Sequence, residues 1–206
     1  KALQDVSFSL ASGEMSFLTG HSGAGKSTLL RLVLMLELTI AGKLLVNDSD
    51  LCVTPSRHAH LVRQQIGMIF QDHTLLQEKT VFDNVALPLL IAGLDYQEIG
   101  KRVRAALDMV GLLSRERSWP GMLSGGEQQR VGIARAVVGM PPILLAVEPT
   151  GNQDPVLSRI LFDLFRQLNE HGVTVLIASH DLSLIRSMGQ RVLVLSDGRL
   201  VDDISA

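Results

Sequence analysis

The sequence predicts an α/β fold in which a mixed sheet is flanked by helices and carries a separate helical portion. A short strand over residues 15–19 leads into a glycine-rich loop that opens a helix. Runs typical of buried strands at residues 143–147 and 174–179 lie on either side of an expected helix over residues 155–169, which indicates parallel strands covered on both faces. Between about residues 72 and 122 the apolar residues follow helical spacing only.

The N-terminal half is expected to hold an antiparallel β portion beside the glycine-rich loop. Apolar and polar residues alternate here in short runs, which is the pattern of half-buried strands. The expected elements are strands over residues 6–10 and 43–46, a short helix over residues 58–65 and a buried strand over residues 66–70. Gln71 lies at the exit of the last of these strands.

Two amphipathic helices are predicted within the helical portion. Thr80 and Asp83 have the spacing of a capping box, and Pro88 is expected to kink the helix that follows. The two apolar stripes comprise Phe82, Val85, Ala86, Leu89 and Leu90 in the first helix, and Ile99, Val103, Ala106, Leu107 and Val110 in the second. We expect both stripes to be core rather than docking surface. They belong to a helical subdomain over about residues 72–122 of a single domain, whose remaining parts are residues 1–71 and 123–206.

Composition limits the class of protein. With 206 residues, of which 46% are hydrophobic, the chain suits one domain with a smaller subdomain. Its formal net charge of −2, spread without a basic stripe, argues against a nucleic-acid partner. The single cysteine, Cys52, excludes an internal disulfide and a cysteine-rich zinc site and suits a reducing, cytosolic compartment. No apolar run approaches the roughly 18 residues that span a bilayer.

The glycine-rich loop carries a phosphate-binding motif. It reads Gly20-His21-Ser22-Gly23-Ala24-Gly25-Lys26-Ser27-Thr28, which matches G-x-x-x-x-G-K-[ST] between a strand and a helix. Glycines allow backbone N–H groups to fold around phosphate oxygens, and the helix N-terminus adds a favourable dipole. Lys26 is placed to reach the β- and γ-phosphates, and Ser27 to ligate Mg²⁺. The motif therefore predicts a nucleotide site.

A second motif reads Leu123-Ser124-Gly125-Gly126-Glu127-Gln128-Gln129-Arg130. Ser124 and Glu127 have capping-box spacing, and the two glycines between them leave the helix N-terminus bare toward an anion. The octet resembles the signature motif of the ABC-type ATPases, and on this resemblance the fold is identified as a P-loop NTPase of ABC type. The resemblance implies that residues 123–128 bind the γ-phosphate held by the P-loop of a second copy, in a head-to-tail homodimer with two composite sites.

The same resemblance assigns roles to further residues. It implies that Gln71 contacts Mg²⁺ and the attacking water, that Glu148 orients and deprotonates this water, and that His180 contacts the γ-phosphate. Asp154 ends a segment that resembles the D-loop of the nucleotide site. ATP and Mg²⁺ are the expected cofactors, with Ser27 and Gln71 as the metal-binding side chains.

Within the family, three stretches resemble the ATPases that act in bacterial cell division. They are residues 19–25, 66–73 and 130–138, and residues 80–89 strengthen the resemblance. It implies an integral membrane partner, a peripheral location at the cytoplasmic face of the bacterial inner membrane and a role in controlling cell-wall hydrolysis at the septum. Lipoprotein-release and macrolide-export ATPases of the same family are the alternatives.

Three features depart from the family pattern. Val147 stands directly before Glu148, where the family has an Asp that holds Mg²⁺ through water. Leu38-Thr39-Ile40 occupies a turn that usually holds a proline between two polar residues, and Met35 replaces a small glycine. The aromatic residue that stacks on adenine in relatives is expected to precede Lys1, in native N-terminal residues that this sequence omits.

Three functions are compatible with these patterns. The first is an ATPase that converts nucleotide-driven dimer closure into force on a membrane partner, received around residues 71–85. The second is a soluble ABC ATPase acting on DNA or ribosomes, which would need long coiled-coil or basic insertions that this sequence lacks. The third is a nucleotide-gated scaffold that hydrolyses ATP slowly because Val147 supplies no carboxylate.

Overall fold

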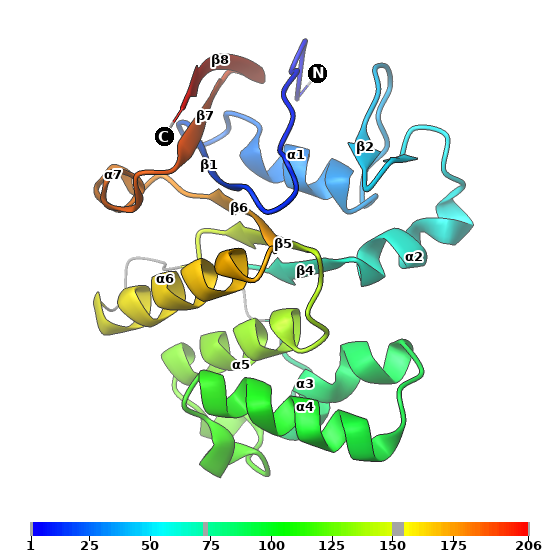
Figure 1. Ribbon diagram of the computed structural model, residues 1–206, viewed down its shortest axis with the longest axis vertical. Coiled ribbons are helices and arrows are strands. Elements are labelled where there is room, and N and C mark those ends of the chain that lie inside the picture. Colours follow the sequence, from blue (N-terminus) through cyan, green and yellow to red (C-terminus); the bar gives the residue numbers. More distant parts are fainter. Residues whose placement is uncertain (1, 72–73, 150–154, 206) are drawn as a thin grey trace.

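A six-stranded sheet with the order β4-β5-β6-β1-β7-β8 forms the centre of the protein in the computed structural model, which describes residues 2–71, 74–149 and 155–205 (Figure 1). Its strands are β1 (Met15–Thr19), β4 (Ile66–Ile69), β5 (Ile143–Val147), β6 (Thr174–Ala178), β7 (Arg191–Ser196) and β8 (Arg199–Ile204). The strands from β4 to β7 in this order pair in parallel, and β8 pairs antiparallel with β7. The predicted mixed α/β sheet is confirmed.

Helices cover both faces of this sheet (Figure 1). They are α1 (Lys26–Val33), α2 (Ala59–Gln64), α3 (Val81–Ile91), α4 (Tyr96–Met109), α5 (Gly125–Val137), α6 (Pro155–Glu170) and α7 (Leu182–Met188). Phe17 of β1 and Ile177 of β6 belong to the core cluster that holds α5 and α6. Their neighbours Leu18 and Leu176 belong to the cluster that holds α1 and α2, because successive strand residues point to opposite faces.

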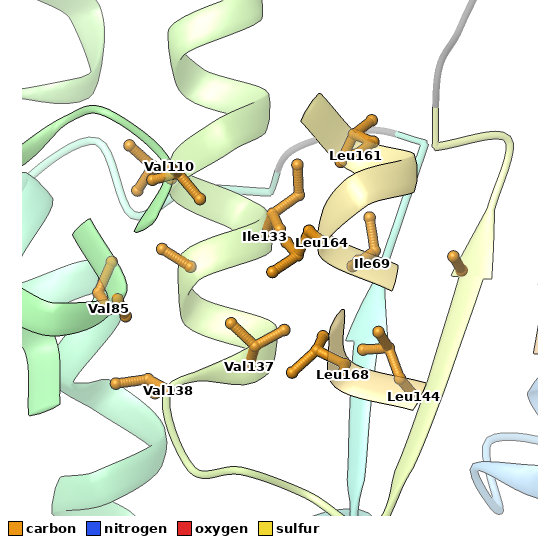
Figure 2. Close-up of a cluster of buried hydrophobic side chains, with 14 of the residues drawn as sticks. Ile69, Val85, Val110, Ile133, Val137, Val138, Leu144, Leu161, Leu164 and Leu168 are labelled. Atoms are coloured by element: carbon orange, nitrogen blue, oxygen red, sulfur yellow. The ribbon is translucent and has the colours of Figure 1, made fainter. Parts of the chain in front are cut away.

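Helices α5 and α6 share the larger of the two cores. Figure 2 shows Ile133 and Val137 of α5 beside Leu164 and Leu168 of α6, with Leu144 of β5 in the same group. Each such side chain is at most 5% exposed. Burial of this kind stabilises a fold by roughly 1.5–3 kcal/mol per side chain. The core therefore fixes α5 firmly against the sheet.

Helices α3 and α4 pack with α5 and extend the same core away from the sheet (Figure 1). The hydroxyl of Thr80 accepts a hydrogen bond from the N–H of Asp83 at 3.1 Å, so α3 begins at the predicted capping box. The helix continues through Pro88 to Ile91. The predicted stripe of α4 is buried at every position, namely Ile99, Val103, Ala106, Leu107 and Val110.

The predicted stripe of α3 is partly wrong. Phe82 is only half-buried and Leu90 is 43% exposed. The buried residues of the helix are Val81, Asn84, Val85, Ala86 and Leu89. The core-facing side is thus centred one position earlier, on residues 81, 85 and 89, which lie one turn apart. Phe82 lies at the margin of this face, where it packs against the core and its ring centre lies 5.7 Å from the guanidinium carbon of Arg104.

The predicted strand over residues 6–10 is not part of the sheet. Val6, Phe8 and Leu10 pack against the α1 side of the core, and the residues between them are exposed. The alternation therefore reflects burial and not strand pairing. The antiparallel portion of the N-terminal half is the pair of β2 (Leu45–Val46) and β3 (Ser49–Asp50). Strand β2 covers only the last two residues of the predicted strand over residues 43–46.

The predicted helix over residues 58–65 is divided between a 3₁₀ turn (Ser56–His58) and α2. Arg63 of α2 donates hydrogen bonds to the carbonyls of Leu34 and Met35, both at 2.8 Å, and so caps the end of α1. Two further 3₁₀ turns (Leu113–Arg115 and Pro120–Met122) follow α4. Within the described part of the chain, no helix combines the length and apolar character needed to cross a membrane.

Candidate functional site

The carboxyl ends of four parallel strands lie at one edge of the sheet. Gly20 follows β1, His180 comes shortly after β6, Glu148 follows β5 and Gln71 comes shortly after β4. The strand order places them along this edge as Gln71, Glu148, His180 and Gly20. Ligands of open α/β sheets bind outside this edge. The structure thus brings the glycine-rich loop and the three predicted catalytic residues to the same side of the molecule.

Two positions of the glycine-rich loop require glycine. Gly20 has a φ of 147°, and a Cβ there would collide with the carbonyl oxygen of Leu195 in β7. Gly25 has a φ of 107°, and its Cβ would lie 2.6 Å from Cδ2 of Leu3. Residues with side chains rarely adopt such φ values. The loop is therefore tightly turned and braced against β7 and the N-terminal segment.

Lys26 lies within this turn at the start of α1. Its ammonium donates hydrogen bonds to the carbonyls of Gly20 at 2.6 Å and His21 at 3.1 Å. Gly25 is the N-cap of α1 and offers no side-chain hydrogen bond, and Ser27 is exposed in the first turn of the helix. Uncapped backbone N–H groups, the helix dipole and a lysine together attract an anion. The arrangement can bind a phosphate group.

Glu148 and His180 contact each other directly. Nδ1 of His180 lies 2.8 Å from Oε1 of Glu148, and the side chains are 64% and 17% exposed. The backbone N–H of Glu148 donates to the carbonyl of Ala178 at 2.8 Å. Glu148 has a φ of 43°, a left-handed conformation that costs about 1–2 kcal/mol for a residue with a side chain. Strain of this kind is often found at functional sites.

Val147 ends β5 one residue before Glu148. It pairs in register with Ala178 and packs, half-buried, against the cluster on the α1 side of the sheet. The strand alternation places its side chain on the same face as Leu145. Its isopropyl group offers no oxygen ligand, so this position contributes packing to the edge of the site.

The N-terminus of α5 has the predicted capping box. The carboxylate of Glu127 accepts a hydrogen bond from the N–H of Ser124 at 2.9 Å, and the hydroxyl of Ser124 accepts from the N–H of Glu127 at 3.3 Å. The hydrogen bonds from the backbone and side chain of Ser124 lower the pKa of Glu127 below its usual value. The amide of Gln128 donates to the carbonyl of Leu123 at 3.2 Å.

The glycine-rich loop and the signature motif of one chain do not contact each other through the polar interactions described. Among the residues that the structure describes, no hydrogen bond or ion pair links residues 123–128 to residues 20–28. Nε2 of His21 instead lies 3.5 Å from Oδ1 of Asp197. The predicted D-loop, including Asp154, falls outside the described residues.

Sequence reasoning missed two contacts that α5 makes with loops at the catalytic edge. The side-chain amide of Gln129 donates to the carbonyl of Pro149. Arg135 donates to the carbonyl of Thr74 at 3.1 Å, just beyond the end of β4. The available signal was the position of Gln129 four residues before Ile133, on the buried face of the helix, where a polar side chain needs a partner.

Comparison with known proteins identifies the family. Residues 3–151 match the model of the ABC transporter family. Over 200 residues the chain is 56% identical to the "Cell division ATP-binding protein FtsE" of Escherichia coli strain K12, which covers 97% of this chain and 90% of that protein. The chain belongs to the ABC transporter family. The FtsE of Mycobacterium tuberculosis strain H37Rv is 48% identical over 202 residues, covering 98% of this chain and 88% of that protein.

Other ABC proteins match over the same length. The "Methionine import ATP-binding protein MetN" of Cupriavidus pinatubonensis is 44% identical over 98% of this chain and 59% of that protein. A solved dimeric ATP-binding cassette, in a post-hydrolysis state with ADP and Pi, superposes with a TM-score of 0.92 at 33% identity, covering 99% of this chain and 90% of that chain. The ABC-type fold is confirmed, and the chain is an ATPase that binds and hydrolyses ATP.

Proposed function

We propose that the chain is the ATP-hydrolysing subunit of an FtsE-like ABC complex in bacterial cell division. It couples ATP-driven dimerisation to an integral membrane partner resembling FtsX, and it resides peripherally at the cytoplasmic face of the inner membrane. The FtsE proteins of Escherichia coli and Mycobacterium tuberculosis, at 56% and 48% identity, support this branch over methionine import, whose protein is 44% identical.

The contact between Glu148 and His180 at the edge that carries the glycine-rich loop is the observation that supports the proposed chemistry. Glu148 orients the attacking water and takes its proton, as a general base within hydrogen-bond reach of its substrate does. His180 holds this carboxylate and contacts the γ-phosphate. Gln71, exposed after β4, contacts the water from the other side of Glu148.

Residues 20–28 bind the ATP phosphates. Lys26 exchanges its contacts with two loop carbonyls for the β- and γ-phosphates, which are stronger acceptors because they are charged. Mg²⁺ takes oxygen ligands, and the exposed hydroxyl of Ser27 and the exposed amide of Gln71 fit this preference. These two residues would hold the ion, which neutralises phosphate charge during phosphoryl transfer.

A second copy of the chain completes each site. The capped N-terminus of α5 presents the backbone N–H groups of two glycines, which suit the γ-phosphate bound by the partner's loop. The solved dimeric cassette at 33% identity supports this head-to-tail homodimer. Residues of about 72–122 form the helical subdomain, and the membrane partner binds around residues 71–85. Asp154, in the segment that resembles the D-loop, contributes to the nucleotide site.

A slowly hydrolysing scaffold is the second candidate function, and Val147 is the observation that favours it. Its apolar, half-buried side chain occupies the position where the family pattern has a carboxylate. A scaffold would bind ATP and close as a dimer but release phosphate slowly.

Phosphate release measured with and without the membrane partner distinguishes the two functions. A coupled ATPase is expected to accelerate when the partner is added, and the Glu148→Gln variant is expected to remain silent in both conditions. A rate that stays low and does not respond to the partner would support the scaffold and contradict coupled hydrolysis.

A further inference from the structure

Gln129 is a buried amide in the second turn of α5, the helix that begins with the signature motif. Its side chain is on the helix face that packs into the core, and the residue is 8% exposed. Its amide nitrogen donates to the carbonyl of Pro149. Nearly all buried polar groups in proteins have a hydrogen-bond partner. This bond therefore fixes both the side chain of Gln129 and the carbonyl that it contacts.

The carbonyl of Pro149 belongs to the residue directly after Glu148, whose own backbone is strained. Glu148 has a φ of 43°, although a following proline favours extended backbone for the residue before it. On its other side, the N–H of Glu148 donates to the carbonyl of Ala178. A strained conformation persists only where its surroundings determine it. Here one bond from β6 and one from α5 flank the strained residue.

We propose that Gln129 is a positioning residue that holds the backbone of Glu148 in the conformation required for hydrolysis. The inference rests on the proposed role of Glu148 as the general base. Without the bond to Pro149, the segment can relax toward unstrained φ values, and the carboxylate moves away from its place beside His180. Misplacement of a catalytic group by ~1 Å can cost ~100-fold in rate.

The location of Gln129 connects two different sites. Ser124, at the start of the same helix, is proposed to contact the nucleotide on the partner subunit's loop, whereas Glu148 acts on the nucleotide of its own chain. Residues 124 and 129 lie on one rigid helix, fixed by the core that it shares with α6 (Figure 2). The rigid helix therefore links the contact proposed for Ser124 to the bond between Gln129 and Pro149, beside the base.

Two variants of the full chain test the proposal, with the membrane partner present if the isolated subunit is silent. Gln129→Met keeps the length of the side chain and removes the donor. We expect its kcat to fall by about tenfold or more while KM for ATP stays within about twofold, because ATP binds through residues 20–28. Gln129→Glu can donate to the carbonyl only when its carboxyl is protonated, and burial raises the pKa of such a carboxyl. The ratio of its kcat to that of wild type should therefore rise as the pH is lowered from about 8.5 to about 6.

Asn169 offers a matched control. Its amide also donates to backbone carbonyls, those of Gly13 at 2.8 Å and Val173 at 3.0 Å, but at the opposite edge of the sheet. Asn169→Leu should lower thermal stability and leave kcat per folded molecule unchanged.

A kcat of Gln129→Met within about twofold of wild type, or a Gln129→Glu ratio that does not change with pH, overturns the proposal. If Gln129→Met does not fold, the pH profile of Gln129→Glu decides. If both variants lose ATP binding in proportion to folded protein, Gln129 serves the fold alone and the proposal is wrong. Glu148→Gln in the same assay tests the role of the base separately, since wild-type turnover there would refute that role whatever Gln129 does.

Discussion

Nδ1 of His180 lies 2.8 Å from Oε1 of Glu148 because the strands that precede them pair in parallel up to Val147 and Ala178. Two side chains that leave neighbouring parallel strands at the same edge emerge next to each other. The imidazole occupies one oxygen of the carboxylate in this contact. A water activated by Glu148 must therefore share the carboxylate with His180, which makes the pair, rather than either residue alone, the unit of the proposed chemistry.

Glu148→Gln should retain ATP binding and accumulate a closed dimer. An amide can hold the attacking water but cannot accept its proton, so the step after closure stops. Light scattering with ATP should show a dimer, and phosphate release should fall by ~100-fold or more. A variant that stays monomeric with saturating ATP, when tested beside a wild type that dimerises, would argue against the composite site.

Lys26→Ala should abolish ATP binding at micromolar nucleotide. It removes the ammonium that donates to two carbonyls within the glycine-rich loop and is proposed to move to the β- and γ-phosphates. A calorimetric titration measures the affinity. Lys43→Ala, which removes an exposed lysine outside the loop, is the control and should bind ATP normally. Unchanged affinity of Lys26→Ala would refute the assignment of the phosphate site.

Local signals explain why much of the fold and site could be predicted from the sequence. The capping boxes of Thr80 with Asp83 and of Ser124 with Glu127 each lie within four consecutive residues, and both are present. The glycine-rich loop likewise carries its strand, its turn and its helix start in one contiguous run. In each case the interacting groups are close in sequence, so spacing alone specifies the geometry.

The features that could not be predicted depend on contacts between distant segments. Residues 6–10 alternate as a strand does, but whether they pair depends on neighbours that the sequence does not specify locally. The buried face of α3 lies one position earlier than the predicted stripe. Packing against α5, rather than the periodicity of α3 itself, determines which residues are covered. The bond from Gln129 to Pro149 requires α5 to pack beside the end of β5, which no motif encodes.

Arg191 joins β7 to two other parts of the protein. Its guanidinium lies 2.8 Å from Glu14 and 2.7 Å from Asp203. The hydrogen bonds from Arg191 hold the pKa of Asp203 below its ordinary value of 3.8. Burial raises the pKa of Glu14, but the hydrogen bonds from Ala11 and Arg191 outweigh this effect and bring the pKa below 4.5.

Arg191→Met should therefore destabilise the protein at neutral pH more than in acid. A carboxyl whose pKa is lowered in the folded state stabilises the fold above its unfolded pKa, and this contribution is lost as the pH falls through the folded pKa. The difference in urea midpoint between wild type and variant should be steady from about pH 8 to about pH 5 and narrow below about pH 4. Arg199→Met, which breaks an exposed 3.4 Å pair with Asp5, should change the midpoint little. A difference that stays constant into acid would show that Arg191 acts through packing and its hydrogen bond to the carbonyl of Ser9 and not through the two carboxylates.

Val147→Asp should raise the rate of phosphate release and lower the Mg²⁺ concentration needed for half-maximal rate. The side chain at this position lies at the end of β5, one residue before Glu148, on the face of the sheet that packs against α1. A carboxylate there can accept hydrogen bonds from water bound to Mg²⁺, whereas the wild-type chain leaves Ser27 and Gln71 as the proposed ligands.

Side chains that contact a metal ion through its bound water typically contribute about 10- to 100-fold to metal affinity or activity. A gain of that order is therefore expected in Val147→Asp. The charge replaces a half-buried apolar group, and the variant should therefore also be less stable in urea, most of all without Mg²⁺. Val147→Thr is the matched control, since it keeps the β-branched shape of valine and adds a hydroxyl but no charge. It should leave both the rate and the Mg²⁺ midpoint close to wild type.

The measurement is a Mg²⁺ titration of phosphate release for the three proteins, with the membrane partner present if the isolated subunit is silent. Equal rates and equal midpoints for Val147→Asp and wild type would show that Ser27 and Gln71 suffice for the metal, and the scaffold function would then lose the observation on which it rests.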